Sequence, residues 1–352
     1  MKSVSHGVPQ GSVLGPLLFL LYINDLHECI HNSETFHFAD DTHLLHILKK
    51  HNGRYKLRKL LVDLKSLTHW LLANKISLNV AKTELIYFRR PSVEKPCQVV
   101  KINGVKIQPV DKVKYLGLTL DEFLTWNAHR NILLAKLRRG NNLISIIRHY
   151  APKPIVQQVY YGQFHSHITY ACQSWGLSLP SNSPIITAQK KAVRLMTFSP
   201  HLEHTDPIFK ELKILKINNV IQMQHIVLAH KVITYNSPPT LHGKLDLVET
   251  TDSSARNLPS SRFSVLPGYI YTSSNSSFWE KICKAWNTVL KEMNVALRLK
   301  EEENKNKKRK KKKDGNTKDE YTSLLFHDLS LFDLKHILFE FLCNGSVTNI
   351  ET

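Results

Sequence analysis

The spacing of apolar residues changes near residue 121, and this change is the feature that most constrains the fold. Before it, short apolar runs alternate with turn signals, which is typical of strands and short helices in one mixed region. From Trp126 onward the apolar residues recur at helical spacing, as in Ile132, Leu133, Leu137, Ile144 and Ile147. The pattern predicts an α+β fold class, with a mixed first part followed by a mostly helical second part.

The first part is expected to hold one amphipathic helix, because leucines recur at spacings of three and four from Leu57 to Leu71. The pair Asn103-Gly104 between two apolar runs is the strongest short signal for a β-hairpin. Short strands bounded by turn signals are expected at Thr35–Ala39, Glu84–Phe88, Val99–Ile102, Val105–Ile107 and Val113–Leu120. These elements together fill the mixed region.

In the second part, the periodicity predicts helices at Ile155–Trp175, Ile185–Thr197, Asp206–Leu215, Asn218–Thr234 and Ser277–Leu297. We expect four regions along the chain: a mixed domain over 1–121, a helical region over 122–299, a basic disordered linker over 300–320 and a helical segment over 321–352. Five cysteines without a Cys-x-x-Cys pair favour neither a disulfide framework nor a Cys-type zinc site.

The charge of the chain points to a polyanionic partner. The 352 residues carry 48 Lys and Arg against 29 Asp and Glu, a formal net charge of +19. Such a surplus indicates nucleic acid or an anionic membrane surface. The longest apolar stretch, Val13–Ile23, is interrupted by Gly15-Pro16 and is too short to span about 30 Å of hydrocarbon, so no membrane insertion is expected. The basic run Lys305–Lys313 is a weak nuclear signal or a charged tail, and the expected location is intracellular, in nucleus or cytoplasm.

The most informative local feature is the adjacent pair Asp40-Asp41, which follows the apolar residues of an expected strand. Like charges repel at a hairpin tip, and a divalent cation relieves that repulsion because carboxylate oxygens suit Mg²⁺. An ordinary polar turn is the alternative, and for an isolated pair it is the more frequent explanation. The residues around the pair decide between the two.

Three further segments accompany the acidic pair. Upstream, Gly7–Phe19 is a turn-rich loop that runs into an apolar helix and contains Pro9, Gln10 and Gly11. Downstream, Asn79–Phe88 includes Lys82-Thr83-Glu84 before an apolar strand, and Tyr115-Leu116-Gly117 follows the Asn-Gly hairpin. In this order and spacing, the four segments resemble the motifs of the reverse transcriptase of non-long-terminal-repeat (LINE-like) retrotransposons.

The resemblance implies an RNA-directed DNA polymerase, a nucleotidyltransferase that uses two Mg²⁺ (or Mn²⁺) ions and acts on an RNA template, a DNA primer and deoxynucleoside triphosphates. Residues 1–121 would be a partial palm, followed by a helical thumb and downstream region. By residue, the resemblance assigns metal binding and catalysis to Asp40 and Asp41, and a triphosphate contact to Lys82. It assigns nucleotide and template binding to Pro9, Gln10 and Gly11, and the primer grip to Tyr115, Leu116 and Gly117.

The chain departs from the family at one position. The family pattern places another metal-binding aspartate on a strand upstream of the Gly-x-Pro-Gln-Gly loop, whereas the six residues before Gly7 contain no acid. We therefore expect residues 1–352 alone to be a truncated polymerase that is inactive by itself, with an exposed edge on its palm sheet. The alternative is a non-catalytic nucleic-acid-binding remnant.

Overall fold

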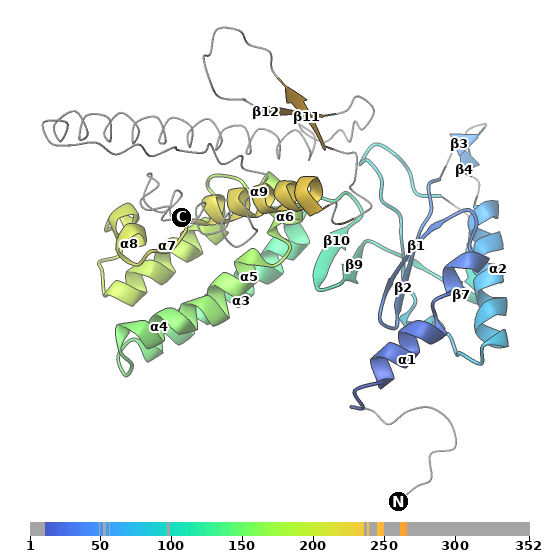
Figure 1. Ribbon diagram of the computed structural model, residues 1–352, viewed down its shortest axis with the longest axis horizontal. Helices are drawn as coiled ribbons and strands as arrows, with labels where there is room; N and C mark the ends of the chain where they lie inside the picture. Colours follow the sequence, from blue (N-terminus) through green and yellow to red (C-terminus); the bar gives the residue numbers. More distant parts are fainter. Residues whose placement is uncertain are drawn as a thin grey trace, which may run out of the picture. The chain divides into compact units, whose positions relative to one another are not determined.

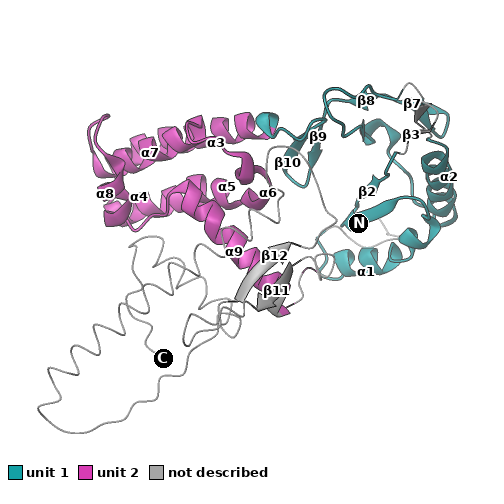
Figure 2. Cartoon of the chain, turned by 90° about the horizontal axis from the view of Figure 1, so that it is seen from above, with its two compact units in different colours: residues 1–128 teal, residues 129–352 magenta. Residues whose placement is uncertain are grey.

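Strands and short helices alternate in the first of two compact units, residues 1–128, whereas helices dominate the described part of the second, residues 129–352 (Figures 1 and 2). The structure, a computed structural model, describes residues 11–48, 50–51, 54–55, 57–96, 99–235, 238, 245–249 and 261–265. The expected helix at Ser277–Leu297, the basic run Lys305–Lys313 and the segment 321–352 lie outside these residues. The predicted mixture of helices and strands is confirmed.

The first unit contains two α-helices, α1 (Gly15–Tyr22) and α2 (Arg58–Ala73), among its described residues. Its strands form two-stranded pairs, antiparallel except for the parallel pair β5·β8. The strands are β1 (Glu34–Phe38), β2 (Asp41–Leu45), β3 (Lys50–His51), β4 (Arg54–Tyr55), β5 (Leu85–Ile86), β6 (Val100–Ile102), β7 (Val105–Ile107), β8 (Pro109–Val110), β9 (Lys112–Tyr115) and β10 (Leu118–Asp121). Within the described ranges, no third strand pairs with β1 or β2.

The expected Asn-Gly hairpin is confirmed. Strands β6 and β7 pair antiparallel with Ile102 opposite Val105, which leaves Asn103-Gly104 as the two-residue loop. Both loop residues have positive φ, 50° and 80°, in the left-handed region that Asn and Gly tolerate best.

The expectation of one strand over Val113–Leu120 is wrong. The chain turns back at Leu116-Gly117, so β9 and β10 form an antiparallel hairpin with Tyr115 opposite Leu118. Leu116 and Gly117 both have positive φ, 43° and 83°. A single glycine after an apolar residue marks a turn less clearly than Asn-Gly does, which is why the apolar run looked continuous.

Helix α2 packs its leucine face against two small clusters that hold the first unit together. One cluster joins Leu67 and Leu71 to Leu26 and Ile30, with Leu44 of β2 against it. The other joins Leu60 to Leu57, Tyr87 and Val100. The predicted amphipathic helix is confirmed, and its buried face supports both the β1–β2 hairpin and the strands that follow.

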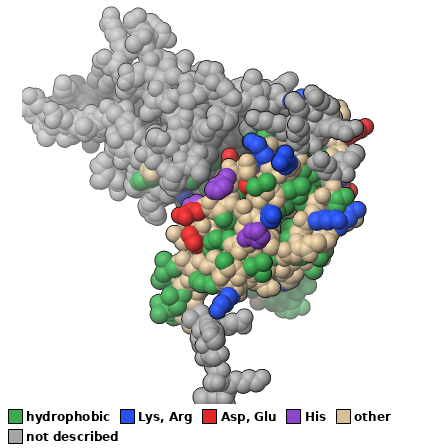
Figure 3. Space-filling view, turned by 90° about the vertical axis from the view of Figure 1, so that its right-hand side faces the viewer, with side chains coloured by type: hydrophobic (Ala, Val, Ile, Leu, Met, Phe, Trp, Pro, Cys, Tyr) green, Lys and Arg blue, Asp and Glu red, His purple; other side chains and the backbone are tan. Residues whose placement is uncertain are grey.

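Helix α1 has an unusual surface. Its sequence is Gly-Pro-Leu-Leu-Phe-Leu-Leu-Tyr, yet none of its residues is buried, and Leu21 is 67% exposed. Apolar side chains reach the surface of this unit in several places (Figure 3). Pro16 lies in the first turn of α1, where a backbone N–H would have no partner within the helix. Proline lacks this N–H, so it suits the start of a helix.

The second unit is a bundle of helices around Trp175, Tyr160 and Phe164, which are fully buried. Its helices are α3 (Asn127–Ile147, beginning two residues before the unit boundary), α4 (Lys153–Tyr160), a π-helical turn (Tyr161–His165), α5 (Ser166–Thr169), α6 (Cys172–Trp175), α7 (Pro184–Thr197), α8 (Thr205–Glu211) and α9 (Ile217–Tyr235). Strands β11 (Leu245–Glu249) and β12 (Ser261–Val265) form a further hairpin. The predicted helices at 185–197 and 218–234 are confirmed, whereas the one at 206–215 ends four residues early, at Glu211.

One buried amide links three helices of this bundle. Gln189 of α7, 1% exposed, donates to the Tyr160 hydroxyl (3.0 Å) and to the Leu215 carbonyl (2.9 Å), and it accepts from the Ile217 N–H (2.8 Å). Burial raises the pKa of the Tyr160 phenol, which therefore stays neutral and able to share this network. In the described part of the chain, no helix has the length and apolarity needed to cross a bilayer.

Candidate catalytic hairpin

The acidic pair lies at the tip of the β1–β2 hairpin, as its position after an expected strand predicted. Phe38 pairs with Asp41, so Ala39-Asp40 forms the loop, and both carboxylates are exposed. Ala39 has φ 53°, in the left-handed region that costs an L-residue roughly 1–2 kcal/mol. Ala39 therefore holds a strained backbone conformation beside two like charges. Strain of this kind clusters at functional sites.

The two faces of the hairpin differ in character. Residues opposite each other on an antiparallel pair share a face, so Phe36, Phe38, Asp41 and His43 lie on one side. On that side Phe38 is 62% exposed. Leu44 lies on the other side and packs on the α2 cluster. The helix therefore supports one face of the hairpin, while the face that carries Asp41 is largely open.

A buried carboxylate on α2 fixes the base of the hairpin. Asp63, 1% exposed, accepts hydrogen bonds from the backbone N–H of His31 and Asn32, the Asn32 side-chain amide (2.8 Å) and the Ser33 hydroxyl (2.7 Å). Burial opposes ionisation of Asp63, but these hydrogen bonds outweigh it and lower the pKa of the carboxyl. Residues 31–33 lead directly into β1, so Asp63 sets where that strand begins.

His46, just after β2, contacts the same segment. Its Nδ1 lies 3.0 Å from the Ser33 hydroxyl and 3.0 Å from the Asn32 carbonyl oxygen. The entry to β1 and the exit from β2 are therefore joined to each other and to α2. A hairpin held at its base in this way presents its tip at a fixed position relative to α2.

The hairpin contacts a second hairpin on its open side. The His43 ring meets the Tyr115 ring edge-on, with centroids 4.6 Å apart and planes at 65°. Tyr115 ends β9 and precedes the Leu116-Gly117 turn. The structure therefore brings together the acidic hairpin and the residues that the family resemblance assigns to the primer grip.

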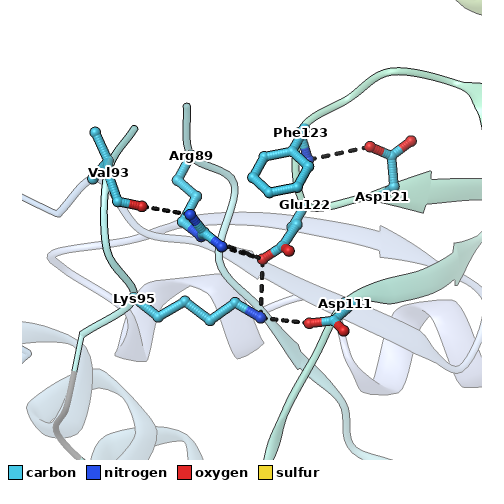
Figure 4. Close-up of polar contacts among 7 residues, drawn as sticks. All are labelled: Arg89, Val93, Lys95, Asp111, Asp121, Glu122 and Phe123. Atoms are coloured by element: carbon cyan, nitrogen blue, oxygen red, sulfur yellow. Dashed lines mark hydrogen bonds and ion pairs between the residues drawn. The ribbon is translucent and has the colours of Figure 1, made fainter. Parts of the chain in front are cut away.

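An ion-pair network holds the base of the β9–β10 hairpin (Figure 4). Glu122, 9% exposed, accepts from Arg89 (3.2 Å) and from Lys95 (2.9 Å), and Lys95 also pairs with Asp111. The hydrogen bonds that Lys95 donates to Asp111 and Glu122 raise the pKa of its ammonium group. The Arg89 guanidinium also lies over the Phe123 ring, 4.8 Å from its centroid. Four charges from three separated segments are thus fixed on one side of this hairpin.

Asp121 organises the loop that leaves β10. Its carboxylate, on a residue 7% exposed, accepts from the N–H groups of Phe123 (3.2 Å), Thr125 (3.0 Å) and Trp126 (3.0 Å) and from the Thr125 hydroxyl (3.1 Å). Leu124 and Trp126 have positive φ, 52° and 65°, and this ring of hydrogen bonds offsets the cost of those conformations.

The other predicted site residues are less closely associated. Lys82 ends a short 3-10 helix, Val80–Lys82, with an exposed side chain, and no ion pair joins it to Asp40 or Asp41. Gly11 is exposed with φ 86°, which explains a glycine there by backbone conformation. Pro9 and Gln10 lie outside the described residues.

The donor chemistry at the hairpin tip suits a hard divalent cation, but the donor set is small. Asp40 and Asp41 offer carboxylate oxygens, the ligands that Mg²⁺ and Mn²⁺ prefer. Within the described ranges, no group of three or more His, Cys, Asp or Glu side chains lies in position to hold a metal ion. The pair therefore fits a cation whose remaining ligands are water, phosphate oxygens or other carboxylates.

Sequence reasoning missed Asp63 and Glu122, the two carboxylates that position the hairpins. Asp63 carried a signal, because it falls three residues after Leu60 and four before Leu67 on the buried stripe of α2. A charged residue in an apolar stripe needs a partner, which is a reason to look for one. Glu122 carried no comparable signal, since its partners Arg89 and Lys95 lie far from it in sequence.

Comparison with known proteins agrees with the family predicted from the four motifs. Residues 2–120 match the model of the family described as "Reverse transcriptase (RNA-dependent DNA polymerase)". This segment contains the β1–β2 hairpin, Lys82 and all but the last residue of the β9–β10 hairpin. The first third of the chain is therefore similar to a reverse transcriptase domain, and the predicted resemblance to a LINE-like reverse transcriptase is confirmed.

The curated relatives are proteins of mobile elements in fruit flies. The chain is 29% identical over 222 residues to the "Probable RNA-directed DNA polymerase from transposon X-element" of Drosophila melanogaster, which covers 60% of this chain and 24% of that protein. It is 28% identical over 238 residues to the "RNA-directed DNA polymerase from mobile element jockey" of the same species, covering 63% and 25%. The chain thus spans about a quarter of these relatives. No solved structure matches it.

Proposed function

We propose that residues 11–128 form part of the active site of an RNA-directed DNA polymerase, with the β1–β2 hairpin supplying carboxylates for two-metal nucleotidyl transfer. The observation that carries the proposal is the contact between His43 and Tyr115, which joins the acidic hairpin to the predicted primer grip. This contact brings together two of the four motifs, and in the proposal the other two serve the same site. The substrates would be an RNA template, a DNA primer and deoxynucleoside triphosphates.

In this proposal, Asp40 and Asp41 hold the divalent cation at the hairpin tip. The bound ion would neutralise negative charge that develops on the phosphates during transfer. The chain's own residues position that tip, since Asp63 and His46 fix the hairpin base while Ala39 sets the turn. Lys82 would approach the triphosphate as a second source of positive charge. The primer would be contacted by Tyr115, Leu116 and Gly117.

We further propose that residues 1–352, tested by themselves, do not extend a primer efficiently. Two carboxylates are a partial ligand set for two cations, and in the part of the chain that the structure describes no third acidic or histidine side chain joins them. The same observation favours a second candidate function, nucleic-acid binding without catalysis. The two are separated by whether the carboxylate pair binds metal.

Metal binding at the hairpin tip tests the proposal directly. Mn²⁺ bound to the purified chain is measured by electron paramagnetic resonance, with and without deoxynucleoside triphosphate. We expect binding that the double variant Asp40→Asn/Asp41→Asn abolishes. The control Glu34→Gln removes an exposed carboxylate at the far end of the same hairpin and should leave binding intact. Equal Mn²⁺ binding by the wild type and the double variant would contradict the assignment.

A primer-extension assay on the same proteins then addresses catalysis. With an RNA template, a labelled DNA primer and Mg²⁺, we expect no extension beyond background by the 352 residues alone. Robust extension that disappears in Asp40→Asn would show that the polymerase assignment is right and the proposed inactivity is wrong. Mn²⁺ binding without extension is the result that supports both proposals.

A further inference from the structure

A groove between α3 and α7 combines an apolar lining with a cation from each helix. Its volume is about 410 Å³, within the size range of ligand sites in proteins. More of the surface that lines it is apolar than polar, and Leu134, Pro184 and Ala188 contribute to that surface. Arg138 of α3 and Lys191 of α7, both exposed, also belong to the lining. A ligand that fits this groove would therefore carry apolar groups together with negative charge.

The two cations of the groove have no counter-charge among the described residues. Residues 129–202 contain nine Lys and Arg and no Asp or Glu. The two acids of α8, Asp206 and Glu211, pair with other lysines. Neither groove cation forms an ion pair in the described part of the chain. Negative charge at this groove would have to come from a ligand or from residues outside the described ranges.

The groove also contains an unused hydrogen-bond acceptor. Asn141, 3% exposed, lines the groove and donates to the Ala188 carbonyl (3.0 Å), which joins α3 to α7. Its Oδ1 is buried and has no hydrogen-bond partner within the described residues. A buried acceptor without a donor costs free energy. A ligand that brings an N–H or O–H group to this place would therefore bind more tightly than a purely apolar one.

One segment of the chain, residues 321–342, has the composition that such a ligand needs. The segment lies outside the described residues, so its sequence alone is used. It contains three acids, Asp328, Asp333 and Glu340, against one lysine. Twelve of its 22 residues are Leu, Ile or Phe. A run this apolar is expected to be covered by a protein surface rather than by water.

Helical spacing would give this segment a stripe that matches the groove. Five residues recur at intervals of three or four: Leu325, Leu329, Phe332, His336 and Phe339. At 3.6 residues per turn, Asp328 falls at one edge of this stripe, and Asp333 and Glu340 fall at the other. Other apolar residues of the segment lie outside the stripe. The stripe is thus mostly apolar with acids on both sides, whereas the groove is mostly apolar with one cation from each helix.

We propose that residues 321–342 bind as a helix in the α3–α7 groove of the same chain. The stripe would cover the apolar lining and remove both surfaces from water, which stabilises the contact through the hydrophobic effect. Acids at the two edges of the stripe would pair with Arg138 and Lys191. The imidazole N–H of His336 would donate to the unused Oδ1 of Asn141. The segment would then be a part of the helical unit.

The segment is long enough in its connection to reach the groove. Residues 236–320 separate it from α9, and a chain of 85 residues extends up to about 280 Å. Because this connection tethers the segment to the unit that holds the groove, its effective concentration favours the same chain over a second copy. The groove lies outside residues 2–120, which match the reverse transcriptase family, so the inference does not rest on the proposed polymerase function.

Photo-crosslinking of the full chain tests where the segment binds. The photoreactive amino acid p-benzoylphenylalanine replaces Asn142, an exposed residue of α3 that lines the groove, and the protein is treated with nuclease before irradiation. Mass spectrometry of the digest should identify crosslinks from position 142 to peptides within 321–342. The matched control carries the same amino acid in place of Lys136, which is exposed on α3 outside the lining. Crosslinking of the control to the segment should be lost.

Charge reversal tests the proposed ion pairs in the same assay. The variant Arg138→Glu/Lys191→Glu should reduce the crosslink yield from position 142 about 5-fold or more, because two attractions become repulsions. Both residues are exposed, so the bundle itself should tolerate the change. Reversal of the segment as well, with Asp328→Lys/Asp333→Lys, is expected to restore most of the yield. Such a rescue would not follow if the first variant had merely unfolded.

A second charge reversal, Lys136→Glu/Lys190→Glu, changes the same two helices outside the lining and should alter the yield by less than about 2-fold. Equal losses in the two charge-reversal variants would overturn the proposal, and so would a lack of crosslinks from position 142 to residues 321–342. The crosslinked protein should migrate as a monomer on a denaturing gel, because groove and segment belong to one molecule. A crosslinked dimer would also overturn the proposal, since the segment would then come from a second copy.

Discussion

The imidazole of His43 lies edge-on against the phenol ring of Tyr115, 4.6 Å between ring centroids, and this pair joins two hairpins more than 70 residues apart in sequence. His43 is two residues past Asp41 on the same face of β2, whereas Tyr115 precedes a tight turn. This contact is expected to couple the positions of the acidic hairpin and the Leu116-Gly117 turn.

A double-mutant cycle on His43→Ala and Tyr115→Ala measures this coupling. We expect an interaction free energy of about 0.5–1.5 kcal/mol from urea unfolding of the first unit, as for other aromatic pairs. The control cycle pairs His37→Ala with Tyr115→Ala, because His37 lies on the opposite face of the hairpin. Coupling of the same size in both cycles would mean that the ring contact carries no specific energy.

Asp63 is expected to dominate the stability of the acidic hairpin. Asp63→Asn replaces an acceptor-only carboxylate with a group that presents an N–H to other donors, at a cost of about 2–3 kcal/mol. Hydrogen–deuterium exchange of residues 31–46, followed by mass spectrometry, should accelerate about 30-fold or more for a loss of this size. Lys59→Gln, on the exposed face of the same helix, is the matched control. Unchanged exchange in Asp63→Asn would contradict the anchoring role.

The pKa of Asp63 also predicts a pH dependence. Its folded pKa is lowered, so the stabilisation is fully present above the unfolded value of about 3.9 and is lost as the pH falls through the folded pKa. The urea midpoint of the wild type should therefore drop more steeply between pH 5 and pH 3 than that of Asp63→Asn. Parallel pH profiles would show that other groups control acid unfolding.

The positive φ of Ala39 predicts that valine at this position destabilises the hairpin more than valine at Thr42 does. Ala39→Val places a β-branched side chain at φ 53° and should destabilise the hairpin by about 1–2 kcal/mol. Thr42→Val, on the adjacent strand, keeps ordinary strand geometry and is expected to change stability by less than about 0.5 kcal/mol. Exchange of the β1–β2 amides measures both. If the valine at position 39 were tolerated, the turn would not be strained.

Glu122 and Asp111 both accept from Lys95, but they differ in burial. Glu122→Gln leaves Arg89 and Lys95 without a buried counter-charge, and we expect a loss of about 1–3 kcal/mol in the free energy of unfolding. The Asp111 side chain is 71% exposed, so Asp111→Asn should have a much smaller effect that vanishes at high salt. Urea unfolding at low and high salt distinguishes the two variants. Equal losses would show that burial does not set the energy of this network.

The fold was predictable where a few neighbouring residues determine the structure by themselves. Asn103-Gly104 fixed its hairpin and the leucines of α2 fixed its buried face, since turn chemistry and periodicity act over a few residues. The turn at Leu116-Gly117 was missed because an apolar residue with positive φ is stabilised by its surroundings rather than by its own preference. The contact between His43 and Tyr115 depends on long-range packing that no local pattern contains.

In the candidate site, too, locally determined features were predictable and long-range contacts were not. The position of Asp40 and Asp41 at a hairpin tip followed from the strand before them, whereas the partners of Asp63 did not follow from its own segment. The contact of Lys82 with the triphosphate stays a prediction. The sequence marks Asp63 as a charged residue in an apolar stripe, but the residues that it binds are identified only in the folded chain.

The exposed apolar helix α1 has a practical consequence for handling this protein. The whole chain has a net charge of +19, so copies of the protein repel one another at low ionic strength. Salt screens this repulsion, and the exposed leucine-rich surface of α1 can then drive self-association. Solubility of the purified chain should therefore fall as salt rises. High salt, however, is what is normally used to remove nucleic acid from a basic protein. The salt needed to strip bound polynucleotide and the salt at which the chain precipitates set opposing limits on any preparation.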